Sequence, residues 1–313
     1  MRKIWLNGKI LPETEAKISV YDSACMFGDT CFEMTRSFKG VQFKLQEHID
    51  RLFMSAKYLR ISIPYTKPEV ELACQYIMEV NKDEFASDDE HRLMINVTRG
   101  ILGIYQNVEG VTPGINVMIT DFPLRWTTAG MGKLFDTGVN CAIPSQRTIP
   151  ASLLEPKVKN RNRIHYLMGN IEVSRLRGEN NWALFLDPDG YIAEGAGCNF
   201  FIVKDKKLFT PEGRNVLRGI SRKWILDNAY DAKEANIEPY DVYDADEAFV
   251  TGTPFCMLPV VSINGIKIGN GKPGPVFDAI LGEWSKDVAI DIKAQIQDWD
   301  KGGVEGTTPY SFK

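Results

Sequence analysis

Hydrophobic and polar positions in the first part of the chain predict strands and two helices. An Asn7-Gly8 pair between apolar flanks is a strong hairpin signal. Further on, apolar residues recur at helical spacing and predict an amphipathic helix; they are Ile49, Leu52, Phe53, Ala56 and Leu59. Apolar and alternating segments around this helix predict strands over 30–38, 41–45, 92–98 and 115–120. A second helix is predicted over 67–80.

The second half of the chain alternates predicted strands with helices. A stretch rich in Gly, Pro and Thr precedes it and is typical of an interdomain linker, which we place at 125–135. The sequence therefore predicts a mixed α/β (α+β) protein with a smaller N-terminal domain over 1–124 and a larger C-terminal domain over 136–313. In the larger domain we expect strands over 182–186, 200–203 and 248–251, a hairpin at 264–265, and helices over 220–228 and 275–295.

Composition narrows the class of protein. The chain has 313 residues, a formal net charge of −4, 44% hydrophobic and 25% charged residues, as in ordinary globular proteins. This balance argues against a nucleic-acid binder. We expect no membrane span and a cytoplasmic location, because the chain has neither a long apolar run nor a secretory signal at its start. The six cysteines and three histidines lack the spacing of a metal site, so no metal is expected.

Two stretches carry groups suited to covalent chemistry. The segment 156–163 is basic, and by itself such a run is more often a solvated surface than a site. A carboxylate, Glu194, stands among small residues after an Asp-Pro-Asp-Gly turn at 187–190, where it would ordinarily be a turn residue. Each feature alone is weak.

Three further features could hold a phosphate. The chain enters a predicted helix at Gly219, Ile220 and Ser221, and backbone N–H groups at a helix start bind anions. A Thr-Gly-Thr turn at 251–253 offers hydroxyl and amide donors, and the guanidinium of Arg51 could clasp a phosphate. A lysine, a carboxylate and a phosphate cup are together the set that pyridoxal 5′-phosphate (PLP) needs.

The motifs resemble those of fold-type IV PLP enzymes, which include branched-chain and D-amino acid aminotransferases, R-selective amine transaminases and aminodeoxychorismate lyase. They occur in that family's order, and a set of this kind is far more specific than any single motif. The matching segments are 27–33, 48–52, the K-x-x-N-R segment at 159–163, the E-G-x-x-x-N-F-F segment at 194–201, 217–222, 251–253 and 269–275.

The resemblance implies a role for each matching residue. Lys159 is the catalytic amine that links to the cofactor; the neighbouring Lys157 is its rival, but Asn162 completes K-x-x-N only with Lys159. Glu194 pairs with the ring nitrogen. The phosphate is bound by Arg51, Gly219, Ile220, Ser221 and Thr253, and the other cofactor contacts are Asn199, Leu217 and Gly252.

The substrate is less well defined by sequence. The Tyr-x-Arg motif of branched-chain enzymes and the Arg-x-His motif of many D-amino acid enzymes are both absent. Arg36 is the preferred candidate for carboxylate recognition, because strand alternation places it on the face of Phe32; Arg99 and Arg92 are the alternatives. Phe32, Thr253 and Pro254 are further candidates for substrate contact.

The resemblance also implies transamination between an amino acid and a 2-oxo acid by a homodimer. The donor is either a branched-chain L-amino acid or a D-amino acid, and the acceptor is of the 2-oxoglutarate or pyruvate type. A PLP lyase and an R-selective amine transaminase are the alternative enzymes. A non-catalytic PLP- or metabolite-binding protein is disfavoured, because Lys159, Glu194 and the phosphate-binding set are all intact.

Overall fold

The computed structural model describes residues 1–110, 113–229 and 231–301. Within these ranges the chain forms two compact units. The first comprises Met1–Leu124 together with Val158–Arg163, and the second comprises Arg125–Lys157 and the described residues from Ile164 onward.

Two segments therefore differ from the expected domain limits. Val158–Arg163, expected in the second domain, groups with the first unit, because its backbone pairs with a strand there: the N–H of Phe32 donates to the carbonyl of Lys159 at 2.9 Å. The expected linker at 125–135 begins with a short helix, Arg125–Thr128, that belongs to the second unit.

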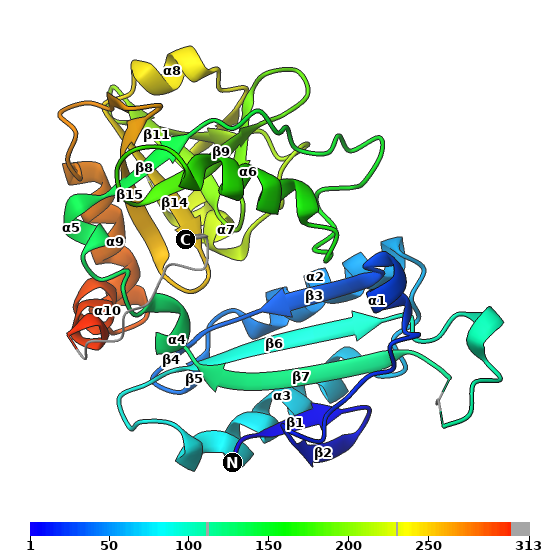
Figure 1. Ribbon diagram of the computed structural model, residues 1–313. Helices are drawn as coiled ribbons and strands as arrows, with labels where there is room; N and C mark the ends of the chain where they lie inside the picture. The colour runs from blue at the N-terminus through cyan, green and yellow to red at the C-terminus, as the bar shows by residue number, and fades with distance from the viewer. Residues whose placement is uncertain (111–112, 230, 302–313) are drawn as a thin grey trace. The chain divides into compact units, whose positions relative to one another are not determined.

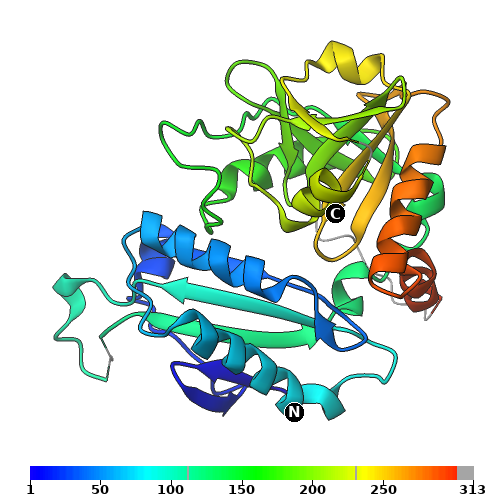
Figure 2. The same ribbon diagram turned by 180° about the vertical axis from the view of Figure 1, so that it is seen from behind.

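In the first unit, an antiparallel sheet with strand order β2-β1-β7-β6-β3 carries two helices, α2 and α3, on one face (Figures 1 and 2). A core of apolar side chains from the sheet and both helices fills the interface. The elements are β1 Lys3–Leu6, β2 Lys9–Pro12, α1 Ser23–Phe27, β3 Thr30–Met34, β4 Ser37–Phe38, β5 Val41–Gln42, α2 Leu45–Tyr58, α3 Lys67–Asn81, β6 His91–Thr98 and β7 Asn116–Pro123, with short 3₁₀ turns at Lys82–Glu84 and Gly103–Tyr105.

Local sequence explains most of these elements. Asn7 and Gly8 both have positive φ, 50° and 85°, and join β1 to β2 as predicted. The expected helix with Ile49 and Leu52 is α2, and both side chains are fully buried. The expected strand over 30–38 is interrupted, since β3 ends at Met34 and a separate two-residue strand, β4, pairs with β5.

In the second unit, the described strands form a sheet that closes on itself. The order runs β10-β9-β8-β15-β14-β11-β12-β13, and β10 also pairs with β11, so six strands complete a ring. The strands are β8 Val139–Ala142, β9 Asn181–Leu186, β10 Ile192–Gly195, β11 Asn199–Lys204, β12 Lys207–Pro211, β13 Lys233–Ala235, β14 Glu247–Gly252, β15 Cys256–Ile263 and β16 Ile266–Lys267; the helices are α4 Arg125–Thr128, α5 Leu134–Thr137, α6 Ile164–Ser174, α7 Ile220–Asn228, α8 Pro239–Tyr243, α9 Pro275–Asp287 and α10 Ile292–Asp300.

The closing helix predicted over 275–295 is wrong in its extent, because the structure has two helices there. The helix α9 ends at Asp287, and Ala289 adopts a φ of 53°, which a continuing helix does not allow. Asp291 then begins α10 by accepting a hydrogen bond from the N–H of Ala294. Among the described helices, these included, none is long and apolar enough to cross a membrane.

Candidate active site

Lys159 lies in the first unit on an extended segment beside β3. Asn160 forms a β-bridge with Cys31, which places Lys159 opposite Phe32. The Lys159 N–H donates to Ser55 Oγ of α2 at 3.3 Å, and its Nζ lies 4.9 Å from the centre of the Phe32 ring. The backbone is thus fixed from two sides, while the amine is held over an aromatic face.

The rival lysine, Lys157, belongs to the second unit and is already engaged. Its Nζ forms an ion pair with Glu155 at 2.5 Å and donates to the carbonyl of Arg214 at 3.2 Å. This amine would have to break both contacts before it could attack a carbonyl carbon. The geometry therefore favours Lys159 as the reactive amine.

Arg51, expected to bind phosphate, makes a bidentate ion pair with Glu33 of β3. Its Nε and Nη2 donate to the two carboxylate oxygens at 2.6 and 2.8 Å, and the Arg51 side chain keeps 13% exposure. Burial alone would raise the pKa of the Glu33 carboxyl, but Arg51 and His48 hold that pKa well below its usual range. Burial lowers the pKa of His48, whose Nδ1–H donates to the Glu33 carboxylate at 2.7 Å.

We expect Glu33→Gln to lower the free energy of unfolding at pH 7 by about 3 kcal/mol, because Arg51 loses its buried counter-charge. The folded-state pKa of Glu33 is depressed, so its contribution is present above the unfolded pKa, about 4.3, and is lost as the pH falls below it. Urea unfolding should therefore show a smaller difference in the free energy of unfolding between the wild type and Glu33→Gln at pH 3 than at pH 7. An equal gap at both pH values would contradict this account. Glu79→Gln, on the exposed face of α3, is the control.

Glu194 is the centre of a hydrogen-bond network in the second unit. The side chain lies on β10 and is 6% exposed. The Tyr166 hydroxyl of α6 donates to Oε1 at 2.7 Å, and Oε2 accepts from Asn199 Nδ2 at 3.1 Å and from the Leu217 N–H at 3.0 Å. Three donors from separate elements hold this carboxylate in one orientation.

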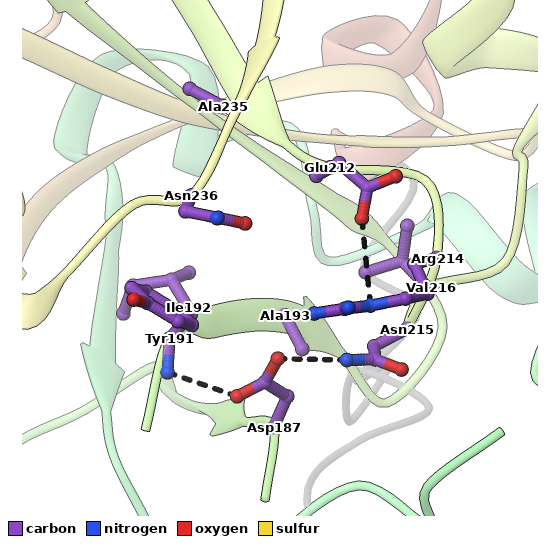
Figure 3. A pocket seen from close by; sticks show the side chains of 10 residues that line it. All are labelled: Asp187, Tyr191, Ile192, Ala193, Glu212, Arg214, Asn215, Val216, Ala235 and Asn236. Atoms are coloured by element: carbon purple, nitrogen blue, oxygen red, sulfur yellow. Dashed lines mark hydrogen bonds and ion pairs between the residues drawn. The ribbon is translucent and has the colours of Figure 1, made fainter. Parts of the chain in front are cut away.

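The loop that supplies Leu217 is itself anchored, as Figure 3 shows. Asp187, at the end of β9, accepts from the N–H of Tyr191 at 3.0 Å and from Asn215 Nδ2 at 2.8 Å. The small pocket around it is closed on the loop side by an Arg214–Glu212 ion pair at 3.8 Å. Asp187 and Asn215, which line this pocket, bond to each other, so we interpret the pocket as structural support for the loop that carries Leu217.

The segments predicted to bind phosphate lie at the start of α7 and at the end of β14. No side chain in the described residues caps the start of α7, where Gly219 is the N-cap residue, so its amides remain available to an anion. A Cβ on Gly219 would lie 2.1 Å from Asn199 Oδ1, so any other residue here would displace the Asn199 side chain, which donates to Glu194. At the end of β14, just before the turn that contains Thr253, Thr251 Oγ1 is buried without a hydrogen-bond partner in the described residues, so this hydroxyl suits contact with a ligand.

The three arginines proposed for carboxylate recognition have other contacts. Arg99 pairs with Asp29 at 2.5 Å and donates to the carbonyl of Leu59 at the end of α2, which is a helix-capping role. Arg36 is 1% exposed and lies 3.8 Å from the centre of the Phe38 ring. Arg92 is 8% exposed on β6. Strand alternation, which favoured Arg36, could not show this burial. Pro254 is buried, and Thr253 is half-buried in the turn.

Sequence reasoning also missed partners of the predicted residues. Tyr166 of α6, which was not among the predicted site residues, is a donor to Glu194. Glu33 and His48 lie within the matching motifs but had no role assigned, although they fix Arg51. Glu33 could have been noticed, because a carboxylate on an apolar strand needs a cationic or hydrogen-bonding partner when it is buried.

Comparison with known proteins identifies the family. The model of the Amino-transferase class IV family matches residues 30–263. A protein of Methanocaldococcus jannaschii, provisionally named a branched-chain-amino-acid aminotransferase, is 34% identical over 95% of this chain and 99% of its own length. The branched-chain-amino-acid aminotransferase of Salmonella typhimurium is 32% identical over 88% of this chain and 90% of its own length.

The fold agrees with that assignment. The solved branched-chain amino acid aminotransferase of Escherichia coli superposes with a TM-score of 0.82 at 29% identity, covering 91% of this chain and 94% of its own. The corresponding T.th. enzyme, solved with pyridoxamine 5′-phosphate, has a TM-score of 0.76 at 27% identity, with coverages of 96% and 97%. The chain belongs to the class IV aminotransferases and is an aminotransferase with their mixed α/β fold.

Proposed function

We propose that this protein is a PLP-dependent aminotransferase that moves an amino group between a branched-chain amino acid and a 2-oxo acid. The observation that carries the proposal is the Glu194 carboxylate, which is buried and held in one orientation by three donors, and a fixed carboxylate of this kind suits a protonated ring nitrogen. The relatives named above are branched-chain enzymes, which favours that donor class over the D-amino acids.

The residues present fit the cofactor. The uncapped start of α7 and the unsatisfied Thr251 hydroxyl suit a phosphate, and the Lys159 amine suits an aldehyde. We therefore assign phosphate binding to Arg51, Gly219, Ile220, Ser221 and Thr253, and further cofactor contacts to Asn199, Leu217 and Gly252. The T.th. relative was solved with the aminated form of the same cofactor, which supports this assignment.

In the proposed mechanism, PLP when bound accepts the electrons released as the substrate loses its Cα proton. Lys159 Nζ would hold the cofactor and would take the proton from the substrate Cα as a general base. Glu194 would keep the ring nitrogen protonated. Tyr166, Asn199 and Leu217 hold that carboxylate in place, so it does not reorganise during the reaction.

The purified protein should be yellow and should bleach on addition of an amino acid. We expect leucine, isoleucine and valine to bleach it in one configuration only, with release of the matching 2-oxo acid. Visible absorption during separate additions of the L- and D-forms measures both reactivity and handedness. A yellow protein that releases pyruvate without an amino acceptor would favour the lyase instead. A protein that stays colourless with added PLP would refute the proposal.

We also propose that the protein is a cytoplasmic homodimer. The family resemblance implies the dimer, and the first unit exposes large apolar side chains such as Phe27, 64% exposed, and Ile104, 79% exposed, that a second subunit could cover. All six cysteines are free and five are buried, which suits a reducing compartment. Sedimentation analysis would test the dimer.

A further inference from the structure

Arg161 follows Lys159 by two residues on the same extended segment, and none of the roles assigned above uses it. The bridge between Cys31 and Asn160 places Arg161 opposite Thr30, whose carbonyl accepts from its N–H at 3.1 Å. Opposite and diagonal side chains of an antiparallel pair share a face. The side chains of Arg161 and Lys159 therefore project to the same side as Phe32.

The Arg161 guanidinium is held in place by contacts with the sheet. Its Cζ lies 3.6 Å from the centre of the Phe32 ring, the same ring that lies 4.9 Å from Lys159 Nζ. Its Nη2 donates to Asn96 Oδ1 of β6 at 2.8 Å and contacts Met94 Sδ at 3.0 Å. Two cations thus share one aromatic side chain, and one of them is the proposed reactive amine.

This guanidinium has no counter-charge in the described part of the chain. No carboxylate there lies within ion-pair distance of the guanidinium, and only Nη2 has a hydrogen-bond partner. The N–H groups of Nε and Nη1 are therefore available to a ligand. The residue is solvent-exposed, but partial burial of its guanidinium, with a smaller effect of the nearby Arg163 charge, lowers the pKa of Arg161 to about 10, which leaves it protonated at neutral pH. A planar fork of this kind matches a carboxylate.

We propose that Arg161 binds a carboxylate of the amino acid or 2-oxo acid that reacts at Lys159. The inference rests on the proposed function, because it takes Lys159 as the reacting group. The carboxylate has two sources: the α-carboxylate that every such substrate carries, or the distal carboxylate of a dicarboxylic acid such as 2-oxoglutarate. Arg161 thereby selects carboxylate substrates over simple amines and ketones.

The test compares charged and neutral ligands on the PLP-loaded protein. Calorimetry gives the dissociation constants of 3-methylbutanoate, of its neutral amide and of glutarate. We expect the wild type to bind its preferred carboxylate about 10- to 100-fold more tightly than the amide, as for a hydrogen bond between charged groups. In Arg161→Met this preference should disappear. If the α-carboxylate is bound, 3-methylbutanoate shows the effect; if the distal one is bound, only glutarate does.

Asn96→Asp provides a second variant that keeps Arg161 in place. The substitution is nearly isosteric and replaces the amide that accepts from Arg161 Nη2 with a carboxylate. The guanidinium thereby gains a counter-charge within the protein. We expect it to weaken carboxylate binding as Arg161→Met does. The matched control is Arg163→Met, which removes a cation from the same segment and should leave the preference for carboxylate over amide unchanged.

Kinetics separate this inference from the proposed function. If both variants keep the wild-type preference for carboxylates while the protein still transaminates, the role of Arg161 is refuted and the function stands. If the loaded wild-type protein does not react with any amino acid, the proposed function fails first. We further expect KM for the carboxylate substrate to rise about 10- to 100-fold in Arg161→Met, whereas bleaching by a simple amine should be unaffected.

Discussion

Lys159→Ala lowers transamination by at least about 10³-fold in our expectation, because one side chain supplies both the covalent attachment and the general base. The backbone of this residue is held by Ser55 and Phe32, so removing the side chain leaves the segment in place. The change should therefore affect chemistry and spare stability. Activity is measured by release of 2-oxo acid, and the attachment by the yellow colour that survives gel filtration.

Lys157→Ala is the matched control for this prediction. Lys157 lies two residues away and carries the same amine, but Glu155 and the carbonyl of Arg214 already engage it. We expect this variant to keep wild-type turnover and colour. Loss of activity in Lys157→Ala with full activity in Lys159→Ala would reverse the assignment of the two lysines.

Glu194→Gln should lower turnover by about 10²- to 10³-fold, in the range measured for the loss of one preorganised electrostatic contact. A neutral amide cannot keep the ring nitrogen protonated. The NH₂ group of the new amide would also point at a donor and lose a hydrogen bond, because Tyr166, Asn199 and Leu217 all donate to the present carboxylate. We therefore expect a shifted absorption spectrum of the bound cofactor together with the loss of rate.

Tyr166→Phe serves as the graded comparison. It removes one donor to Oε1 and leaves the charge and both contacts to Oε2, so its effect on turnover should be well below that of Glu194→Gln. The Phe185 ring, 5.0 Å from that of Tyr166, should hold the new side chain in the same place. Equal losses in the two variants would mean that the hydroxyl, rather than the carboxylate charge, carries the effect.

The sequence by itself determined the elements whose signals are local. The Asn7-Gly8 turn, the apolar face of α2 and the strand–helix alternation of the second unit all depend on residues a few positions apart. The class of enzyme could also be identified in this way, because the motifs around Lys159 and Glu194 are short, ordered and specific. A periodic pattern did not reveal the break between α9 and α10, since one residue with positive φ sufficed to make it.

Only the tertiary structure decided which side chains meet. Contacts between distant parts of the chain depend on strand pairing and burial, which a linear pattern does not encode. Pairing with β3 brought Lys159 and Arg161 onto one aromatic ring and moved their segment into the first unit. Packing of α6 against β9 brought the Tyr166 hydroxyl to Glu194. Arg99, which the sequence suggested as a substrate-binding residue, instead donates to a carbonyl group at the end of α2 that would otherwise lack a partner.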